Sequence, residues 1–198
     1  MSRRVLTAGF VMATLIAVAP MASAQETVDG PLTVRNPVLA ASVQRLAADS
    51  QSWREAIIAV TATGRRAELV TSDQTKRWIQ QDSLAQVHPI TDAQFRVESV
   101  LIVVNLELLQ RLSGLPVAAV DFEDDVDRIV AHEVYGHAIP LLLSGTLAGN
   151  CADPATGQRA IAACAIQREN VIRREMRLGQ RFDYGRGSLA LARRSWQQ

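Results

Sequence analysis

The order of apolar and polar positions predicts a small sheet in the first part of the chain. The strongest signal for a buried strand is the apolar run 100–104, which lies within 97–105. Upstream, residues 53–63 and 67–71 are rich in β-branched side chains and flank the turn signal Gly64-Arg65. This pattern predicts a β-hairpin.

Helical periodicity predicts the elements that accompany the sheet. Asn36 and Pro37 have the residue types of an N-cap and a first helical position. A longer helix is expected over about 124–143, because acidic residues gather where its N-terminus favours negative charge. A last main helix is expected over about 159–178, ended by Gly179. The sequence therefore predicts an α+β domain.

The first 24 residues have the pattern of a secretory signal peptide. Arg3 and Arg4 precede an apolar run over 5–19, and Ala22-Ser23-Ala24 provides the small residues of a cleavage site. We expect cleavage after Ala24, one mature domain over 25–198, and a periplasmic or secreted location. A retained membrane anchor is the alternative, although the apolar run is short for a membrane span.

The net charge bears on the expected binding partners, and the cysteine content bears on an expected disulfide. Cleavage would leave 19 basic against 20 acidic residues, so no nucleic-acid partner is expected, and no membrane partner after cleavage. An exported chain can form disulfides, and Cys151 and Cys164 are the two cysteines of the sequence. A bridge between them is expected; ligation of a metal by the two thiolates is the alternative.

Residues 132–137, HEVYGH, contain two of the three histidines of the chain. Imidazoles are good zinc ligands, and a glutamate next to one of them can accept a proton from activated water. In the helical motif H-E-x-x-H the two histidines lie one turn apart on one face. Here they are five positions apart, about 140° around a regular helix. A π-bulge would absorb the extra residue, and Gly136 is the expected place for it.

A catalytic zinc usually has three protein ligands, so a third ligand is expected from elsewhere in the fold. Glu169 is the best candidate, because it lies on the apolar face of the last helix, where an unpaired carboxylate is costly. Glu175 lies about 120° around the same helix and is expected to form a surface ion pair. Asp153 and His88 are weaker candidates, since both lie in predicted loops.

Together these residues resemble the zincin metallopeptidases, in particular the branch in which a second helix supplies a glutamate ligand. The spacing H-E-x-x-x-H resembles the dipeptidyl peptidase III variant of the motif. Glu169-Asn170 with Arg173 resembles the E-N-x-x-R element of small bacterial peptidase-like domains that carry H-E-x-Y-G-H. The resemblance covers about residues 124–186. It does not extend to the large architecture of dipeptidyl peptidase III, nor to the paired glutamates of that family's second motif.

The resemblance implies a zincin-like α+β fold, in which a small mixed sheet is followed by an active-site helix and a second metal-ligand helix. It implies that His132, His137 and Glu169 bind Zn2+ and that Glu133 is the general base. The implied reaction is hydrolysis of a peptide or protein substrate by activated water. A non-catalytic exported binding protein that keeps the fold, with a structural or lost metal, is the alternative.

The charge that develops on the substrate oxygen requires a hydrogen-bond donor. Tyr184 is the expected catalytic donor, because it follows the ligand helix in a segment that could fold back over the site. Arg181 and Tyr135 are the alternatives.

Overall fold

The computed structural model describes residues 27–75, 83–117, 119–150 and 157–181. The strands are β1 (Thr27–Asp29), β2 (Leu32–Val34), β3 (Arg66–Thr71), β4 (Ala85–Thr91) and β5 (Val97–Val104). The α-helices are α1 (Pro37–Asp49), α2 (Gln51–Thr61), α3 (Leu106–Ser113), α4 (Val120–Val130), α5 (Ile139–Ser144) and α6 (Gly157–Glu175). Two short 3-10 turns, η1 (Ser72–Gln74) and η3 (Leu147–Asn150), and a π-helical segment, η2 (Ala131–Ala138), complete the described chain.

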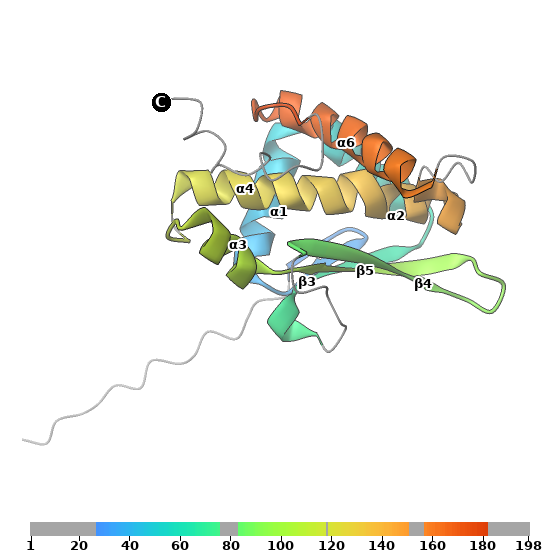
Figure 1. Cartoon of the computed structure of the whole chain (residues 1–198). Helices are drawn as coiled ribbons and strands as arrows, with labels where there is room; N and C mark the ends of the chain where they lie inside the picture. The colour runs from blue at the N-terminus through green and yellow to red at the C-terminus, as the bar shows by residue number, and fades with distance from the viewer. Residues whose placement is uncertain (1–26, 76–82, 118, 151–156, 182–198) are drawn as a thin grey trace, which may run out of the picture.

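The strands form one mixed sheet in the order β1-β2-β3-β5-β4. β2, β3 and β5 run parallel to one another, whereas β1 and β4 pair antiparallel at the two edges. Figure 1 shows α1, α4 and α6 on the same face of this sheet, with α6 on the side of α4 that faces away from the strands. The predicted α+β class, with a small mixed sheet, is confirmed.

The alternation of side chains along the central strands explains where the core lies. Leu69 of β3 and Ile102 of β5 are fully buried in the cluster formed with the helices. Val70, Leu101 and Val103 point to the opposite face, where they form a second, smaller cluster. The main core therefore lies between the sheet and the helices, and η2 contacts β4 and β5 there.

The hairpin predicted around Gly64-Arg65 is wrong, because residues 53–61 belong to helix α2. The Ser50 side chain caps α2 by accepting a hydrogen bond from the Trp53 amide at 3.0 Å. Trp53 and Val60, seven positions apart, are buried on one side of the helix. The cap and this helical spacing outweigh the β propensity of the segment. The strand predicted over 67–71 is confirmed as part of β3.

The loop predicted at His88-Pro89 is also wrong, since both residues lie in β4. Proline is tolerated there because β4 is an edge strand. The predicted N-cap at Asn36 is confirmed: its side chain accepts from the amides of Val38 and Leu39.

The acidic segment before the histidine motif has a further role besides placing negative charge at a helix end, where Asp121 and Glu123 lie in the first turn of α4. Asp125 and Asp127 are buried, and each pairs with an arginine. Arg45 of α1 donates two hydrogen bonds to Asp127, at 2.9 and 2.8 Å. Asp127 therefore ties α4 to α1, whereas Asp125 pairs with Arg128 within α4.

The predicted signal peptide lies outside the described residues. Among the helices that the structure describes, none is both long enough and apolar enough to cross a bilayer.

Candidate metal centre

The helix that carries HEVYGH is widened over the motif. Residues 131–138 are π-helical, and the amide of Ile139 donates to the carbonyl of Val134, five residues earlier. A ladder of i→i+5 hydrogen bonds brings residues five positions apart to neighbouring places on one face. The predicted widening between His132 and His137 is confirmed.

Pro140 gives this distortion a local cause. Proline has no amide hydrogen, and its ring clashes with the carbonyl four residues earlier in a regular helix. That carbonyl belongs to Gly136, the residue expected to host the bulge. Arg168 of α6 donates to the Gly136 carbonyl at 3.2 Å, so it replaces the donor that Pro140 lacks. The four-residue spacing of Gly136 and Pro140 is the sequence signal for this cause.

Gly136 is also required by the packing of η2 on α6. A Cβ atom at this position would lie 3.1 Å from the Ala165 carbonyl oxygen and 3.3 Å from the Ala165 Cβ. Both distances are tighter than ordinary van der Waals contact. The absence of a side chain therefore allows α6 to approach the histidine motif closely.

The two imidazoles of the motif face each other. The Nε2 atoms of His132 and His137 are 3.2 Å apart, and the rings are nearly perpendicular. Two nitrogens bound to one tetrahedral zinc at about 2.0–2.1 Å lie about 3.3 Å from each other. The spacing of the two Nε2 atoms therefore fits two ligands of a single zinc ion.

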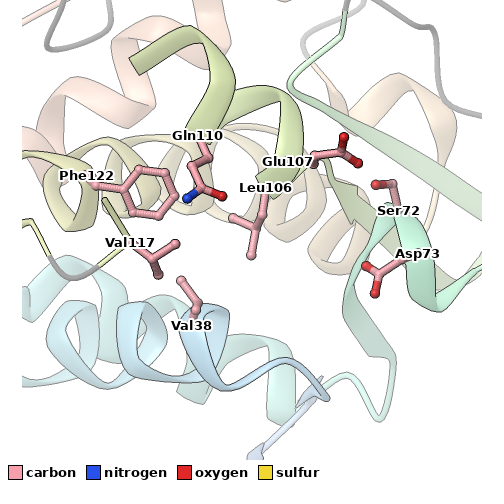
Figure 2. A pocket seen from close by; sticks show the side chains of 8 residues that line it. All are labelled: Val38, Ser72, Asp73, Leu106, Glu107, Gln110, Val117 and Phe122. Carbon is pink, nitrogen blue, oxygen red and sulfur yellow. The ribbon is translucent and has the colours of Figure 1, made fainter. Parts of the chain in front are cut away.

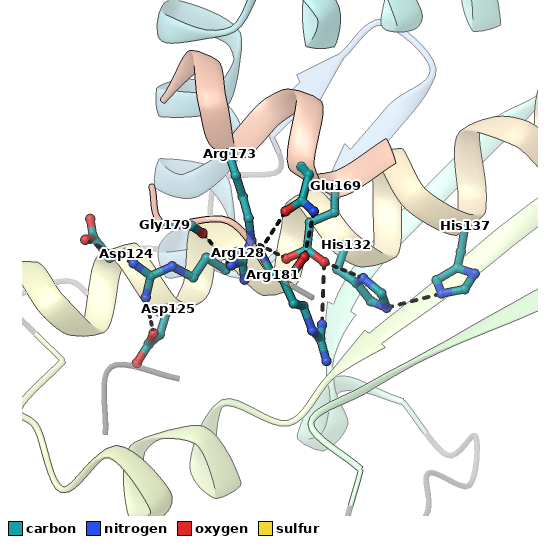
Figure 3. Close-up of polar contacts among 10 residues, drawn as sticks. Asp124, Asp125, Arg128, His132, His137, Glu169, Arg173, Gly179 and Arg181 are labelled. Atoms are coloured by element: carbon teal, nitrogen blue, oxygen red, sulfur yellow. Dashed lines mark hydrogen bonds and ion pairs between the residues drawn. The ribbon is translucent and has the colours of Figure 1, made fainter. Parts of the chain in front are cut away.

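Glu169 lies behind His132. Its Oε2 atom is 2.8 Å from the Nδ1 atom of His132, and its carboxylate is fully buried. Figure 3 shows Glu169 and His137 on different sides of the His132 ring. Glu169 is thus brought to the motif, but it does not share the space between the two Nε2 atoms. This differs from the expectation that His132, His137 and Glu169 converge on one point.

This contact fixes the tautomer of His132. A carboxylate only accepts hydrogen bonds, so Nδ1 of His132 carries a proton and Nε2 of the neutral ring has its lone pair available. Burial raises the pKa of the Glu169 carboxyl, but the hydrogen bond from His132 and the charges of Arg173 and Arg181 outweigh burial and lower this pKa. Glu169 is therefore an anion, and it turns the Nε2 lone pair of His132 toward His137.

A buried arginine pairs with this carboxylate. Arg173 donates its Nε–H to Oε1 of Glu169 at 2.5 Å, and its Nη1 donates to the Gly179 carbonyl at 2.7 Å. Arg128, which is also buried, pairs with Asp125 at 2.7 Å. The contacts of Glu169 and Arg173 in Figure 3 therefore join η2, α6 and the turn that follows α6, whereas the Arg128–Asp125 pair lies within α4.

Two further charged residues adjoin this site, Glu133 in the sequence and Arg181 in space. Glu133 follows His132 directly on η2 and is half-buried. Arg181 follows α6, and its Nη1 atom lies 3.5 Å from Oε2 of Glu169.

Two of the other candidates are engaged elsewhere. Tyr135 forms a hydrogen bond with Ser52 of α2, and burial, the largest effect, raises the pKa of its hydroxyl. Glu175 is not in the predicted surface ion pair: its carboxylate accepts from the Ser50 hydroxyl, and from the Ser52 hydroxyl and amide at 2.6 and 3.2 Å. Both side chains therefore meet the N-terminus of α2.

His88 lies on the far face of the sheet. Its neighbour Val87 packs against the core under the helices, and successive strand residues point to opposite faces. His88 is paired with Leu101, which belongs to the small cluster on that far face. It is therefore separated from the histidine motif by the sheet.

Asp153, Tyr184 and Cys151 lie outside the described residues. Cys164 of α6 is disulfide-bonded, and Cys151 is the only other cysteine of the sequence. Among the described residues, no group of three or more histidine, cysteine, aspartate or glutamate side chains converges on one metal position. Within that part of the chain, the two imidazoles of the motif are the donors whose spacing fits one zinc ion.

A separate cavity of about 330 Å³ lies where α1, η1, α3 and the start of α4 meet (Figure 2). Its polar lining comes from Ser72, Asp73, Glu107 and Gln110. No residue of the histidine motif lines it. This cavity and the histidine pair are distinct features of the fold.

Comparison of the chain with family models, with curated proteins and with solved structures finds no match. The functional assignment therefore rests on the residues of the histidine motif and their geometry.

Proposed function

We propose that this chain is an exported zinc metallopeptidase of the zincin type. The observation that carries the proposal is the pair of Nε2 atoms of His132 and His137, 3.2 Å apart across a π-helical segment. A π-helix is an unusual structure found often at functional sites, and here it brings two histidines together that a regular helix would separate.

His132 and His137 would hold the metal through Nε2. When bound, zinc lowers the pKa of a water molecule and polarises a carbonyl oxygen. The proton on Nδ1 of His132, shared with Glu169, keeps the ring in the tautomer that a metal ligand needs. We therefore assign Glu169 to positioning His132, in place of the direct ligation that the sequence resemblance implies.

Glu133 is assigned the role of general base. It is adjacent to His132 in the sequence, half-buried, and on the π-helical segment that carries both imidazoles. In this role its carboxylate takes a proton from the attacking water and gives it to the departing amine.

The edge strand β4 supports an extended peptide as the substrate. The Asn105 amide donates to the Leu84 carbonyl, so the alternation of the ladder turns the backbone groups of Ala85, Val87 and Pro89 away from β5. The same strand contacts η2. A peptide added along this edge would therefore have its backbone next to the histidine motif.

Metal content and peptide hydrolysis of the wild type and of Glu133→Gln test the proposal. The wild type should bind one zinc ion per chain and cleave peptides. Glu133→Gln should keep the zinc and lose hydrolysis by about 10²- to 10⁴-fold, the usual contribution of a general base. Glu175→Gln, on α6 and away from the imidazoles, is the matched control and should keep its activity.

The alternative, a non-catalytic exported binding protein, is favoured by one observation: within the described part of the chain, three metal-binding side chains do not converge. A wild type that holds stoichiometric zinc but cleaves no peptide supports this alternative. A wild type without zinc contradicts the metallopeptidase proposal.

A further inference from the structure

Two consecutive residues of α6 contact the two histidines of the motif in different ways. Oε2 of Glu169 lies 2.8 Å from Nδ1 of the His132 ring. Its neighbour Arg168 donates from Nη1 to the carbonyl of Gly136 at 3.2 Å. That carbonyl and the amide nitrogen of His137 belong to one planar peptide unit. Helix α6 therefore holds one histidine by its ring and the other by its backbone.

An ion pair does not explain where Arg168 lies. Arg173, on the next turn of α6, pairs with the carboxylate of Glu169. Arg168 is half-buried, and burial, the largest effect, lowers the pKa of its guanidinium. Within the described part of the chain no carboxylate pairs with Arg168, and its hydrogen bond goes to the Gly136 carbonyl. A partly desolvated cation without an anionic partner is costly, so this contact calls for another explanation.

The carbonyl that Arg168 holds is the one that the helix leaves without a donor. Pro140, four residues after Gly136, has no amide hydrogen to give to it. A hydrogen bond from a charged donor is stronger than one between neutral groups, so the guanidinium is well suited to replace the missing amide. Ala165, one turn before Arg168, packs against Gly136 as well. The peptide unit that carries His137 is thus supported by α6 at two points.

We infer that Arg168 is a positioning residue for His137, and that Arg168 and Glu169 together set the 3.2 Å spacing of the two Nε2 atoms. The inference rests on the proposed function, since it concerns the proposed zinc ligands. Arg168 acts through the backbone of one ligand and takes no part in proton transfer. Without it the peptide unit between Gly136 and His137 is free to rotate. The fraction of molecules with both imidazoles in place then falls, and zinc affinity falls with it.

The first test measures zinc affinity of the full chain by competition with a chromophoric chelator. Arg168→Met removes the N–H donors and keeps an unbranched side chain. It should weaken zinc binding by about 10- to 100-fold, the loss typical of removing a partner that supports a ligand. Arg168→Lys keeps a charged donor and should recover part of this loss. The matched control is Arg174→Met, at an exposed arginine of the same helix, which should bind zinc as the wild type does.

A spectroscopic measurement separates positioning from a general loss of stability. Co2+ bound in place of zinc absorbs visible light, and its bands report the geometry of the ligands around the metal. The cobalt-loaded Arg168→Met variant should show shifted or weakened bands, whereas Arg174→Met should reproduce the wild-type spectrum. A variant that is only less stable would keep the wild-type bands in its folded, loaded form.

A third measurement tests whether Arg168 acts on the Gly136 carbonyl. In the metal-free protein, Arg168→Met should lower the unfolding temperature by about 2–10 °C, because a carbonyl loses its partner. In the Pro140→Ala background the decrease should be smaller, since the new amide at position 140 can donate to the same carbonyl. Equal decreases in the two backgrounds would show that Arg168 stabilises the fold in another way. If Arg168→Met does not fold, Arg168→Lys takes its place in the cycle.

The outcomes distinguish this inference from the proposed function. A wild type that binds zinc, with affinity and cobalt spectrum unchanged in Arg168→Met, overturns the role of Arg168 and leaves the zinc site in place. An equal loss of affinity in Arg174→Met also overturns it. A wild type that binds zinc without cleaving peptides contradicts the peptidase function alone, because positioning is read from the metal. A wild type without zinc contradicts both.

Discussion

At the residue scale, the surroundings of His132 determine what the motif can do. One ring nitrogen meets a buried anion and the other meets a second imidazole, so the proton and the lone pair of the ring have defined positions. A buried carboxylate that holds a histidine in this way raises the basicity of the ligand and fixes its orientation. The distinction between positioning and ligation by Glu169 is therefore measurable as a difference in zinc affinity.

Glu169→Gln should weaken zinc binding by about 10- to 100-fold, the loss typical of removing a partner that supports a ligand. Glutamine keeps an oxygen that accepts from Arg173, so the change removes the charge with little loss of shape. His137→Ala, which removes a ligand, should cost considerably more. The measurement is competition with a chromophoric zinc chelator. Equal losses in the two variants would instead mean that Glu169 ligates the metal directly.

Helical periodicity could predict that the Glu169 side chain points into the fold, but not which side chains it contacts there. The position on an apolar helical face indicated a buried, compensated carboxylate, and Glu169 is fully buried. Its actual partners are His132, 37 positions earlier, and Arg173 on its own helix. The side of the His132 ring on which the carboxylate lies depends on how α6 packs against η2. That packing is a tertiary property, so helical spacing within α6 does not contain it.

At the element scale, η2 combines two sequence signals that act together. The five-residue histidine spacing requires a widened helix if both rings are to meet, and Pro140 removes the hydrogen bond that would keep the helix regular at Gly136. Proline in a helix interior costs about 3 kcal/mol relative to alanine. Here that cost falls on the regular α-helical form, in which the Pro140 ring would clash with the Gly136 carbonyl, so Pro140 favours the π-helical form.

Pro140→Ala should therefore separate stability from metal binding. The new alanine would offer an amide to the Gly136 carbonyl, in competition with Arg168, and would allow the helix to tighten. The metal-free protein should unfold at the same temperature as the wild type or a higher one. Zinc affinity should fall by about 10- to 100-fold, because only the widened fraction binds with both histidines.

Pro37→Ala is the matched control for Pro140→Ala. Pro37 is in the first turn of α1, where a missing amide hydrogen is tolerated, so its replacement should leave zinc affinity unchanged. Zinc titration and thermal unfolding of both variants give the two quantities. Undiminished zinc affinity in Pro140→Ala would contradict a role for Pro140 in shaping η2.

The elements that sequence could predict are those whose signals are local. Asn36 caps α1, the apolar run of β5 forms a buried strand, and the histidine spacing predicted the widened helix. The prediction of a strand over residues 53–63 is wrong because it rests on their Ile, Val and Thr content, which favours strands. Ser50 carries the opposing local signal, since it caps α2. The tertiary contacts that favour the helix, from Ser50 to Glu175 and around the buried Trp53, have no local sequence signal.

At the scale of the whole molecule, the histidine motif lies between the sheet and the outer helix α6. η2 packs against β4 and β5 on one side and against α6 on the other. Its cluster of buried charges also reaches the turn after α6 through Arg173 and Gly179. A metal ion held by His132 and His137 would fix the widened form of η2, on which both of these contacts depend, so metal binding is expected to stabilise the domain.

Zinc binding should accordingly raise the unfolding temperature of the wild type. A ligand that binds only the native state, present at 100 times its Kd, adds about 2.7 kcal/mol to the free energy of unfolding. For a domain of this size, that corresponds to a rise of roughly 5–10 °C. Calorimetric unfolding with zinc and with EDTA measures the shift. Glu133→Gln should keep the full shift, because Glu133 is assigned to proton transfer, whereas His137→Ala should lose most of it. A shift that survives in His137→Ala would place the stabilising zinc elsewhere in the chain, and the facing imidazoles would then require a different explanation.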